Sequence, residues 1–188
     1  MKNLKKIKGD ASFRQFYRKK NKDLSSIIVF AKKDKLKNLI IYDSINRLLN
    51  KNKILAPRLY NENYKKNYIE IQDFGDETIF KILKQKKNNK YNIFKKIIKV
   101  LSQIQLIKNT KTKNFRKKEY KVPKYDMEIL VREANLFCDW YAKKELNKKD
   151  IKIFTRKFKG IVKKLTLELK LKNNVFVHRD FHVSNLML

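Results

Sequence analysis

The apolar pattern of the chain changes character once, at residues 72–76. Before this point, β-branched residues gather in short runs, and the run at 25–31 predicts a buried strand. One stretch in this first part, 36–49, carries apolar residues at helical spacing, and after residue 76 almost every apolar stretch does. We therefore expect an α+β fold, with a strand-rich first part, a mostly helical second part and a cleft between them.

Local signals predict the individual elements. Further strands are expected near 9–18, at 58–60, at 67–71 and at 175–177, with a turn at 61–63. Helices are expected at 76–84, 91–107, 127–146 and 150–171, with a lysine-rich loop before the third of them. The caps expected for the first, third and fourth of these helices are Asp76, Asp126 and Asp150. The last two helices should turn apolar faces inward that include Phe137, Tyr141, Phe154, Phe158, Ile161 and Leu165.

Glycine and cysteine are scarce, which excludes several classes of site. The chain has three glycines, too few for the glycine-rich phosphate loops of Walker or dinucleotide-binding proteins. Its one cysteine, Cys138, excludes an internal disulfide and a cysteine-based zinc site, and fits a reducing compartment. No apolar run approaches the roughly 20 residues of a membrane span. We expect a cytoplasmic protein without a membrane partner.

The chain is strongly basic, with 49 Lys and Arg against 18 Asp and Glu and a formal net charge of +31. The lysines are scattered among many Asn and Ile residues, a composition typical of AT-rich genomes. A dedicated nucleic-acid surface would gather its cations on one face or one helix. We therefore expect no specific nucleic-acid partner, and a non-catalytic basic RNA-binding module is kept as an alternative.

Residues 178–185 read His-Arg-Asp-Phe-His-Val-Ser-Asn and fit the catalytic-loop pattern of phosphoryl-transfer enzymes. Asp180 is the candidate base that orients an acceptor hydroxyl and takes its proton. Asn185 is the candidate oxygen ligand of a Mg²⁺ ion. His178 and His182 could form a metal pair, but without a third ligand we expect His178 to pack against the loop and hydrogen-bond there.

Three motifs resemble the aminoglycoside phosphotransferase and choline kinase group, and within it the cell-wall sugar kinases. They are the segment 9–18, the stretch 125–141 with Arg132-Glu133 and Cys138-Asp139-Trp140-Tyr141, and the loop 178–187. The resemblance implies a protein-kinase-like two-lobe fold. Its nucleotide-binding lobe would be 1–72, its hinge 73–76 and its helical lobe 77–188.

The resemblance also implies ATP and Mg²⁺ as cofactors and assigns roles to residues of this chain. Ser12, Phe13 and Arg14 would form the turn over the ATP phosphates. Lys32 would pair with a phosphate, although Lys33 and Lys35 beside it equally fit a solvated charge run. The backbone of Gln72 and Asp73 would hold the adenine edge. The acceptor sugar would meet Arg179, Glu133 and Trp140.

The function implied is transfer of the ATP γ-phosphate to a small sugar, at the anomeric hydroxyl of N-acetylmuramate or N-acetylglucosamine, in peptidoglycan recycling. The alternatives are a kinase of another small alcohol, such as an aminoglycoside, choline or homoserine, and a pseudokinase without turnover. Relatives carry a second metal-binding aspartate in a strand after the catalytic loop, and the sequence ends at Leu188 before any such residue. We therefore expect a C-terminally truncated chain that is inactive by itself.

Overall fold

The computed structural model describes residues 4–7, 14–21, 24–85, 89–170 and 175–187. These residues form two compact units. The first extends to Val122 and takes in the segment from His178 onward, and the second is Pro123–Val177. Contacts thus divide the chain at these points, while the lobe boundary expected at 73–76 stays a prediction.

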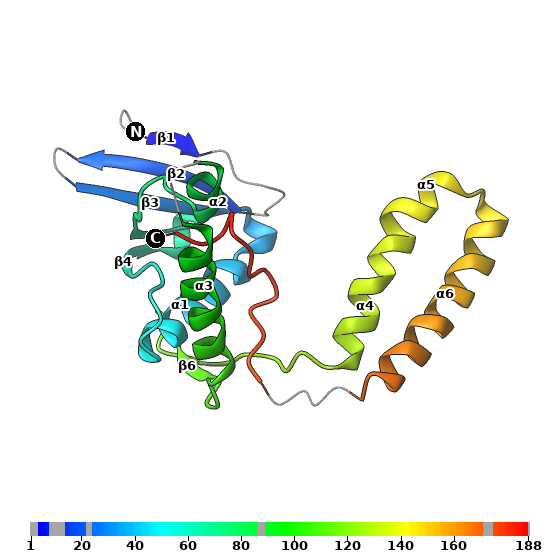
Figure 1. Ribbon diagram of the computed structural model, residues 1–188. Helices are drawn as coiled ribbons and strands as arrows, with labels where there is room; N and C mark the ends of the chain where they lie inside the picture. The colour runs from blue at the N-terminus through cyan, green and yellow to red at the C-terminus, as the bar shows by residue number, and fades with distance from the viewer. Residues whose placement is uncertain (1–3, 8–13, 22–23, 86–88, 171–174, 188) are drawn as a thin grey trace. The chain divides into compact units, whose positions relative to one another are not determined.

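The first unit is built on a five-stranded antiparallel sheet with strand order β1-β2-β3-β5-β4 (Figure 1). The strands are β1 (Leu4–Ile7), β2 (Arg14–Asn21), β3 (Leu24–Ala31), β4 (Leu59–Asn63) and β5 (Tyr68–Gln72). In the central strand β3, Val29 pairs with Phe16 on one side and with Ile69 on the other. The strands expected at 25–31, 58–60 and 67–71 are confirmed, and β1 was not expected. The chain turns later than predicted, through a 3₁₀ turn at Tyr64–Lys66, because Asn67 adopts the left-handed conformation that closes the turn.

Helix α1 (Lys37–Lys51) packs on one face of this sheet. Val29, Ala31, Leu39 and Ile69 meet there without solvent exposure. Because side chains alternate along a strand, every second residue of β3, namely Ile27, Val29 and Ala31, lies in this core.

A short β-hairpin packs against α1. Its strands β6 (Lys111–Lys113) and β7 (Glu119–Lys121) lie in the segment expected to be a loop. The amide of Phe115 donates to Asp43 Oδ2 at 2.8 Å, and Arg47 Nε donates to the same oxygen at 2.8 Å. Burial raises the pKa of Asp43, while the bonds from Arg47 and Phe115 oppose that shift. A buried carboxylate thus joins two segments that lie far apart in the sequence.

Helices α2 (Ile79–Lys84) and α3 (Lys90–Gln105) form a second apolar cluster. The prediction that Asp76 caps α2 is wrong. The cap is Thr78, whose Oγ1 accepts from Lys81 N at 3.3 Å, while Asp76 is bound by Arg18. Ion pairing with Arg18 holds the Asp76 carboxylate away from the helix start.

The second unit is a helical hairpin, in which α4 and α6 run side by side (Figure 1). Asp126 caps α4 (Met127–Phe137) as expected, accepting from Ile129 N at 3.0 Å. The single helix expected at 127–146 is interrupted by a π-helical turn, Cys138–Ala142, before α5 (Lys143–Glu145). The cap of α6 (Lys148–Glu168) is Asn147 and not Asp150. Asn147 Oδ1 accepts from Asp150 N at 2.9 Å, and Asp150 Oδ2 accepts from Asn147 Nδ2 at 2.7 Å, a reciprocal pair that puts Asp150 inside the first turn.

A row of partly exposed aromatic rings lies along the contact between the two helices of the hairpin. Phe137 stacks on Phe158 with ring centroids 5.5 Å apart and on Tyr141 at 5.3 Å. Phe154 and Phe158 are partly buried as expected. Four other residues expected to face inward are largely exposed, because two helices cover only a stripe of each other: Phe137 (45%), Tyr141 (58%), Ile161 (59%) and Leu165 (55%). Residues 175–177 are irregular and not the expected strand, although Phe176 is buried. Among the described residues, no helix has the length and apolar character needed to cross a membrane.

Candidate active site

The loop 178–187 is anchored on α2 and α3 by its apolar side chains and its carbonyls. Phe181, Val183 and Leu186 pack against the apolar cluster of those helices. Ile79 N donates to Leu186 O at 2.8 Å, and Phe80 N donates to Val183 O at 3.0 Å. Asp180, His182 and Asn185, which neighbour these anchors in the sequence, are exposed.

Three polar side chains of the loop meet on its exposed side. Asn185 Nδ2 donates to Asp180 Oδ2 at 2.7 Å and lies 3.0 Å from His182 Nε2. His182 Nε2 lies 3.1 Å from Asp180 Oδ1, and its role as donor or acceptor depends on the tautomer. The backbone turn is closed by Asn185 N, which donates to His182 O at 2.9 Å. The structure thus brings together the two residues that the motif singles out, and adds His182 to them.

His178, at the start of the loop, is half-buried. Its ring meets Phe181 edge-on with centroids 5.6 Å apart, and among the described residues its Nδ1 has no hydrogen-bond partner. Packing against the loop is therefore confirmed, but a hydrogen bond from Nδ1 is not formed. Burial lowers the pKa of His178, Asp180 opposes this shift and His182 adds to it. The described residues contain no group of three or more His, Cys, Asp or Glu side chains placed to hold a metal.

The residues expected at the ATP phosphates are only partly described. Ser12 and Phe13 lie outside the described residues. Arg14 begins β2, and its guanidinium carbon lies 4.7 Å from the ring centroid of Tyr42 on α1. Lys32 is exposed directly before the 3₁₀ turn Lys33–Lys35, which fits the solvated charge run. Phosphate binding by these residues stays a prediction.

The segment after β5 is held by Arg18, a residue that the sequence analysis did not single out. Arg18 Nε and Nη2 donate to the two carboxylate oxygens of Asp73 at 2.6 and 3.1 Å. Arg18 Nη1 donates to Asp76 Oδ2 at 2.6 Å. Burial acts to raise the pKa of Asp73, but hydrogen bonds from Arg18 and from Gly75 N outweigh it and the pKa is lowered. Adenine binding by the backbone of Gln72 and Asp73 stays a prediction.

The expected acceptor residues fall in both units. Arg179 has a φ of 69° beside Asp180 in the first unit. In the second unit, Glu133 accepts a short hydrogen bond from Tyr125 Oη, and Trp140 is 71% exposed in the π-helical turn. Contact of these side chains with a sugar stays a prediction.

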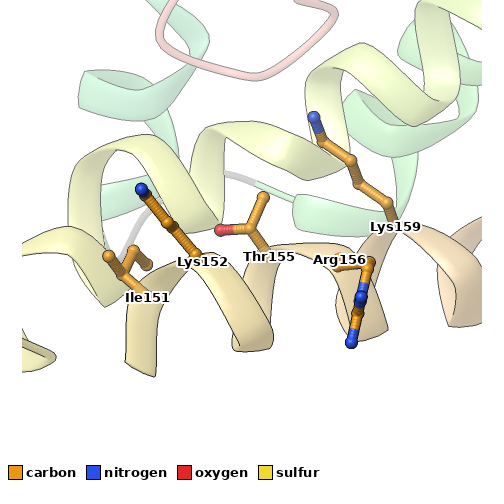
Figure 2. A pocket seen from close by; sticks show the side chains of 5 residues that line it. All are labelled: Ile151, Lys152, Thr155, Arg156 and Lys159. Carbon is orange, nitrogen blue, oxygen red and sulfur yellow. The ribbon is translucent and has the colours of Figure 1, made fainter. Parts of the chain in front are cut away.

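A separate depression lies on α6 (Figure 2). Its lining comes entirely from that helix and consists of Ile151, Lys152, Thr155, Arg156 and Lys159. Lys152, Arg156, Lys159 and Lys163 are spaced 4, 3 and 4 residues apart and therefore share one helix face. The four side chains are exposed, and no described residue forms an ion pair with them. The sequence analysis did not identify this cluster, because lysines outside this helix face are interspersed with the four cations in the sequence.

The sequence profile of the APH family, described as the phosphotransferase enzyme family, matches residues 3–188. The chain belongs to this family. The family has a protein-kinase-like fold, so the fold class expected from the sequence is confirmed.

The curated relatives carry one name, N-acetylmuramate/N-acetylglucosamine kinase. The protein from Neisseria meningitidis serogroup B is 27% identical over 180 residues, covering 95% of this chain and 51% of the relative. Those from Pseudomonas aeruginosa and Pseudomonas putida are 26% and 27% identical over 179 and 182 residues, covering 95% of this chain and 49% of each relative. The chain thus spans about half the length of the curated relatives it matches, and the resemblance expected from the motifs is confirmed.

The half-buried imidazole of His178 should make stability depend on pH. Because its pKa is lower in the folded state than in the unfolded state, its stabilising contribution is complete above pH 6.5 and is lost as the pH falls through the folded value. His178→Phe keeps the edge-on packing and should flatten the decrease in unfolding free energy between about pH 7 and pH 5. Urea unfolding of the full-length protein at several pH values measures this. An unchanged pH dependence in this window would contradict a lowered pKa of His178 in the folded state.

Proposed function

We propose that the protein is an ATP-dependent, Mg²⁺-dependent phosphotransferase whose active centre is the loop 178–187. The observation that carries the proposal is the contact between Asp180 and Asn185 on the exposed side of a loop anchored to α2. Asp180 is open to solvent, with 70% of its side chain exposed, so an acceptor hydroxyl can reach its carboxylate. Membership of the phosphotransferase family supports the same chemistry.

The two side chains have separate tasks in this proposal. The carboxylate of Asp180 orients the acceptor hydroxyl and accepts its proton as the phosphoryl group is transferred. The contacts of Asn185 with Asp180 and His182 run through the amide nitrogen, so the amide oxygen lies on the other side of the group. Carboxylate and amide oxygens are hard donors that suit Mg²⁺, which usually completes its shell with phosphates and water. A bound Mg²⁺ would neutralise charge on the transferred phosphoryl group.

The acceptor we propose is the anomeric hydroxyl of N-acetylmuramate or N-acetylglucosamine. The names of the three relatives, which match over 95% of this chain, support this choice. Arg179, Glu133 and the exposed Trp140 are the residues proposed to meet the sugar. A cytoplasmic role in recycling peptidoglycan sugars fits the need for ATP and the single buried thiol of Cys138. The alternative acceptors are an aminoglycoside, choline or homoserine.

Asp180→Asn tests the catalytic role directly. In the full-length protein it should lower kcat by about 10²–10⁴, because a general base is lost, while ATP affinity is kept. ADP release with each sugar, and with choline, homoserine and an aminoglycoside, measures activity and acceptor choice together. The exposed Asp34→Asn, on the turn after β3, is the matched control for charge. Retention of most activity would remove Asp180 from the mechanism, and turnover with another alcohol only would overturn the sugar assignment.

Asn185→Ala should raise the Mg²⁺ concentration needed for half-maximal activity, since it removes an oxygen ligand and leaves the base. Asn185→Asp keeps an oxygen at this position but loses the amide donor to Asp180, so its Mg²⁺ requirement should rise less. Titration of initial rates with Mg²⁺ distinguishes the two variants, and Ser184→Ala on the same turn is the control. An equal Mg²⁺ requirement in wild type and Asn185→Ala would exclude a ligand role for Asn185.

A second candidate function is weak, non-specific binding of nucleic acid, favoured by the cation stripe of α6 (Lys152, Arg156, Lys159 and Lys163). The stripe is about 16 Å long and could track several phosphates of a single strand. Its cations gather on one face of one helix, as they do in nucleic-acid-binding surfaces. We propose it as an accessory property beside phosphoryl transfer.

Replacing Lys152, Lys159 and Lys163 with Gln should weaken binding of single-stranded RNA and lower the salt dependence. The slope of log K against log salt should fall by about 0.7 for each phosphate that the variant no longer neutralises. Lys95, Lys96 and Lys99 on α3, replaced together with Gln, form a control of equal charge. Fluorescence anisotropy at several salt concentrations measures both. Equal decreases in affinity for the two triple variants would assign the binding to diffuse charge, whereas sequence-selective binding at physiological salt would favour an RNA-binding module as the main function.

A further inference from the structure

We propose that Arg18, on strand β2, is a positioning residue for the loop that carries Asp180 and Asn185. The inference rests on the proposed function, because its readout is phosphoryl transfer. It extends that function to a residue that is distant from the loop in sequence. The connection runs from Arg18 to the segment 73–76, then to the start of α2, and from there to the loop.

The first step is the fork of hydrogen bonds around Arg18. Its guanidinium binds both oxygens of Asp73, one oxygen of Asp76 at 2.6 Å, and the carbonyl of Gly75 at 2.9 Å. The side chain of Arg18 is 13% exposed and that of Asp73 is 3% exposed. A planar guanidinium that satisfies several acceptors at once holds them in a fixed arrangement, which a lysine ammonium cannot reproduce.

The backbone of the 73–76 segment is shaped to meet this fork. Gly75 has a φ of +88°, a conformation that glycine adopts without steric cost. Its amide donates to Asp73 Oδ1 at 2.8 Å while its carbonyl accepts from Arg18. Both polar groups of this residue are therefore used to close the segment around Arg18.

The second step leads from this segment into α2. The carbonyl of Asp76 accepts from Lys81 Nζ at 2.8 Å and from Thr78 N at 3.2 Å. Thr78 in turn caps the helix through its hydroxyl. The start of α2 is thus hydrogen-bonded to Asp76, and Arg18 binds the side chain of Asp76.

The third step joins α2 to the loop. The first amides of a helix have no partner within the helix, and here those of Ile79 and Phe80 donate to Leu186 O and Val183 O. Thr78 also forms an antiparallel bridge with Met187. A change in the start of α2 therefore changes the position of the loop, and misplacement by about 1 Å can cost about 10²-fold in rate.

The experiment compares four variants of the full-length protein: Arg18→Gln, Arg18→Lys, Asp76→Asn and the double variant Arg18→Gln/Asp76→Asn. The control is Lys19→Gln, next to Arg18 on β2. It removes the ion pair between Lys19 Nζ and Glu70 Oε1 of β5 (3.1 Å) and leaves the segment 73–76 unchanged. The measurements are kcat, KM for ATP and for the acceptor, amide hydrogen exchange of peptides covering 76–85 and 178–187, and unfolding free energy.

Arg18→Gln should lower kcat by about 10-fold to 10²-fold with little change in the KM of the acceptor. It should also speed amide exchange in both peptides. Arg18→Lys should restore only part of kcat, and the double variant should lose less than the product of the two single losses. Lys19→Gln should leave kcat and both peptides near wild type.

The proposal is overturned if Arg18→Gln leaves kcat and exchange in 178–187 at wild-type values. It is also overturned if kcat falls only in proportion to a loss of folded protein, because this would make Arg18 a general stabiliser. An inactive wild type would overturn the proposed function alone. The exchange data would then decide the coupling: faster exchange in 178–187 supports it, and unchanged exchange refutes it.

Discussion

Two backbone hydrogen bonds at the start of α2 hold the candidate active site in place. The amides of Ile79 and Phe80 need acceptors outside their helix, and the carbonyls of Leu186 and Val183 supply them. Phe181, Val183 and Leu186 fill the apolar cluster beneath. Because these groups face the helices, Asp180, His182 and Asn185 face outward. Within one short loop, the apolar residues thus anchor the loop to the helices, and the polar residues form the candidate active site.

Carboxylates are scarce in a chain of net charge +31, and several join segments that are distant in sequence. Asp43 links α1 to the β6–β7 hairpin, Glu70 links β5 to Lys19 of β2, and Asp73 links the end of the sheet to Arg18. These carboxylates are largely buried and receive strong donors. Asp180 differs, since its contacts are an amide and an imidazole and its side chain is open to solvent. A carboxylate in that setting can receive a substrate hydroxyl.

Different observations support different parts of the functional proposal. The geometry of the loop and membership of the phosphotransferase family support phosphoryl transfer from ATP. The acceptor is supported by the names of the relatives, since the fold alone hosts many acceptors. Contact of Trp140 and Glu133, both in the second unit, with a sugar ring stays a prediction.

The sequence by itself determined the α+β class, the buried strand at 25–31, the helix α1, the Asp126 cap and the pairing of Asp180 with Asn185. These features depend on local periodicity, on a side chain bonding to a nearby amide, or on a short spacing within one loop. The sequence misplaced the caps of α2 and α6, where an aspartate lies close to the residue that caps the helix. At α2, Arg18 binds Asp76, and Thr78 is the cap. At α6, Asn147 and Asp150 bond reciprocally, and Asn147 is the cap. The hairpin at 111–121 was missed because its strands are short and lysine-rich, and packing against α1 holds them.

Only the tertiary structure decided the contacts of Arg18. In the sequence, Arg18 is one of 49 Lys and Arg residues, and although it ends the segment 9–18, nothing local indicates which carboxylates it binds. The fold brings it to Asp73 and Asp76, more than fifty positions away, because β3 lies between β2 and β5 in the sheet. Contacts of this kind depend on which strands become neighbours, and that is settled by packing of the whole sheet on α1 and not by the residues nearby in the chain.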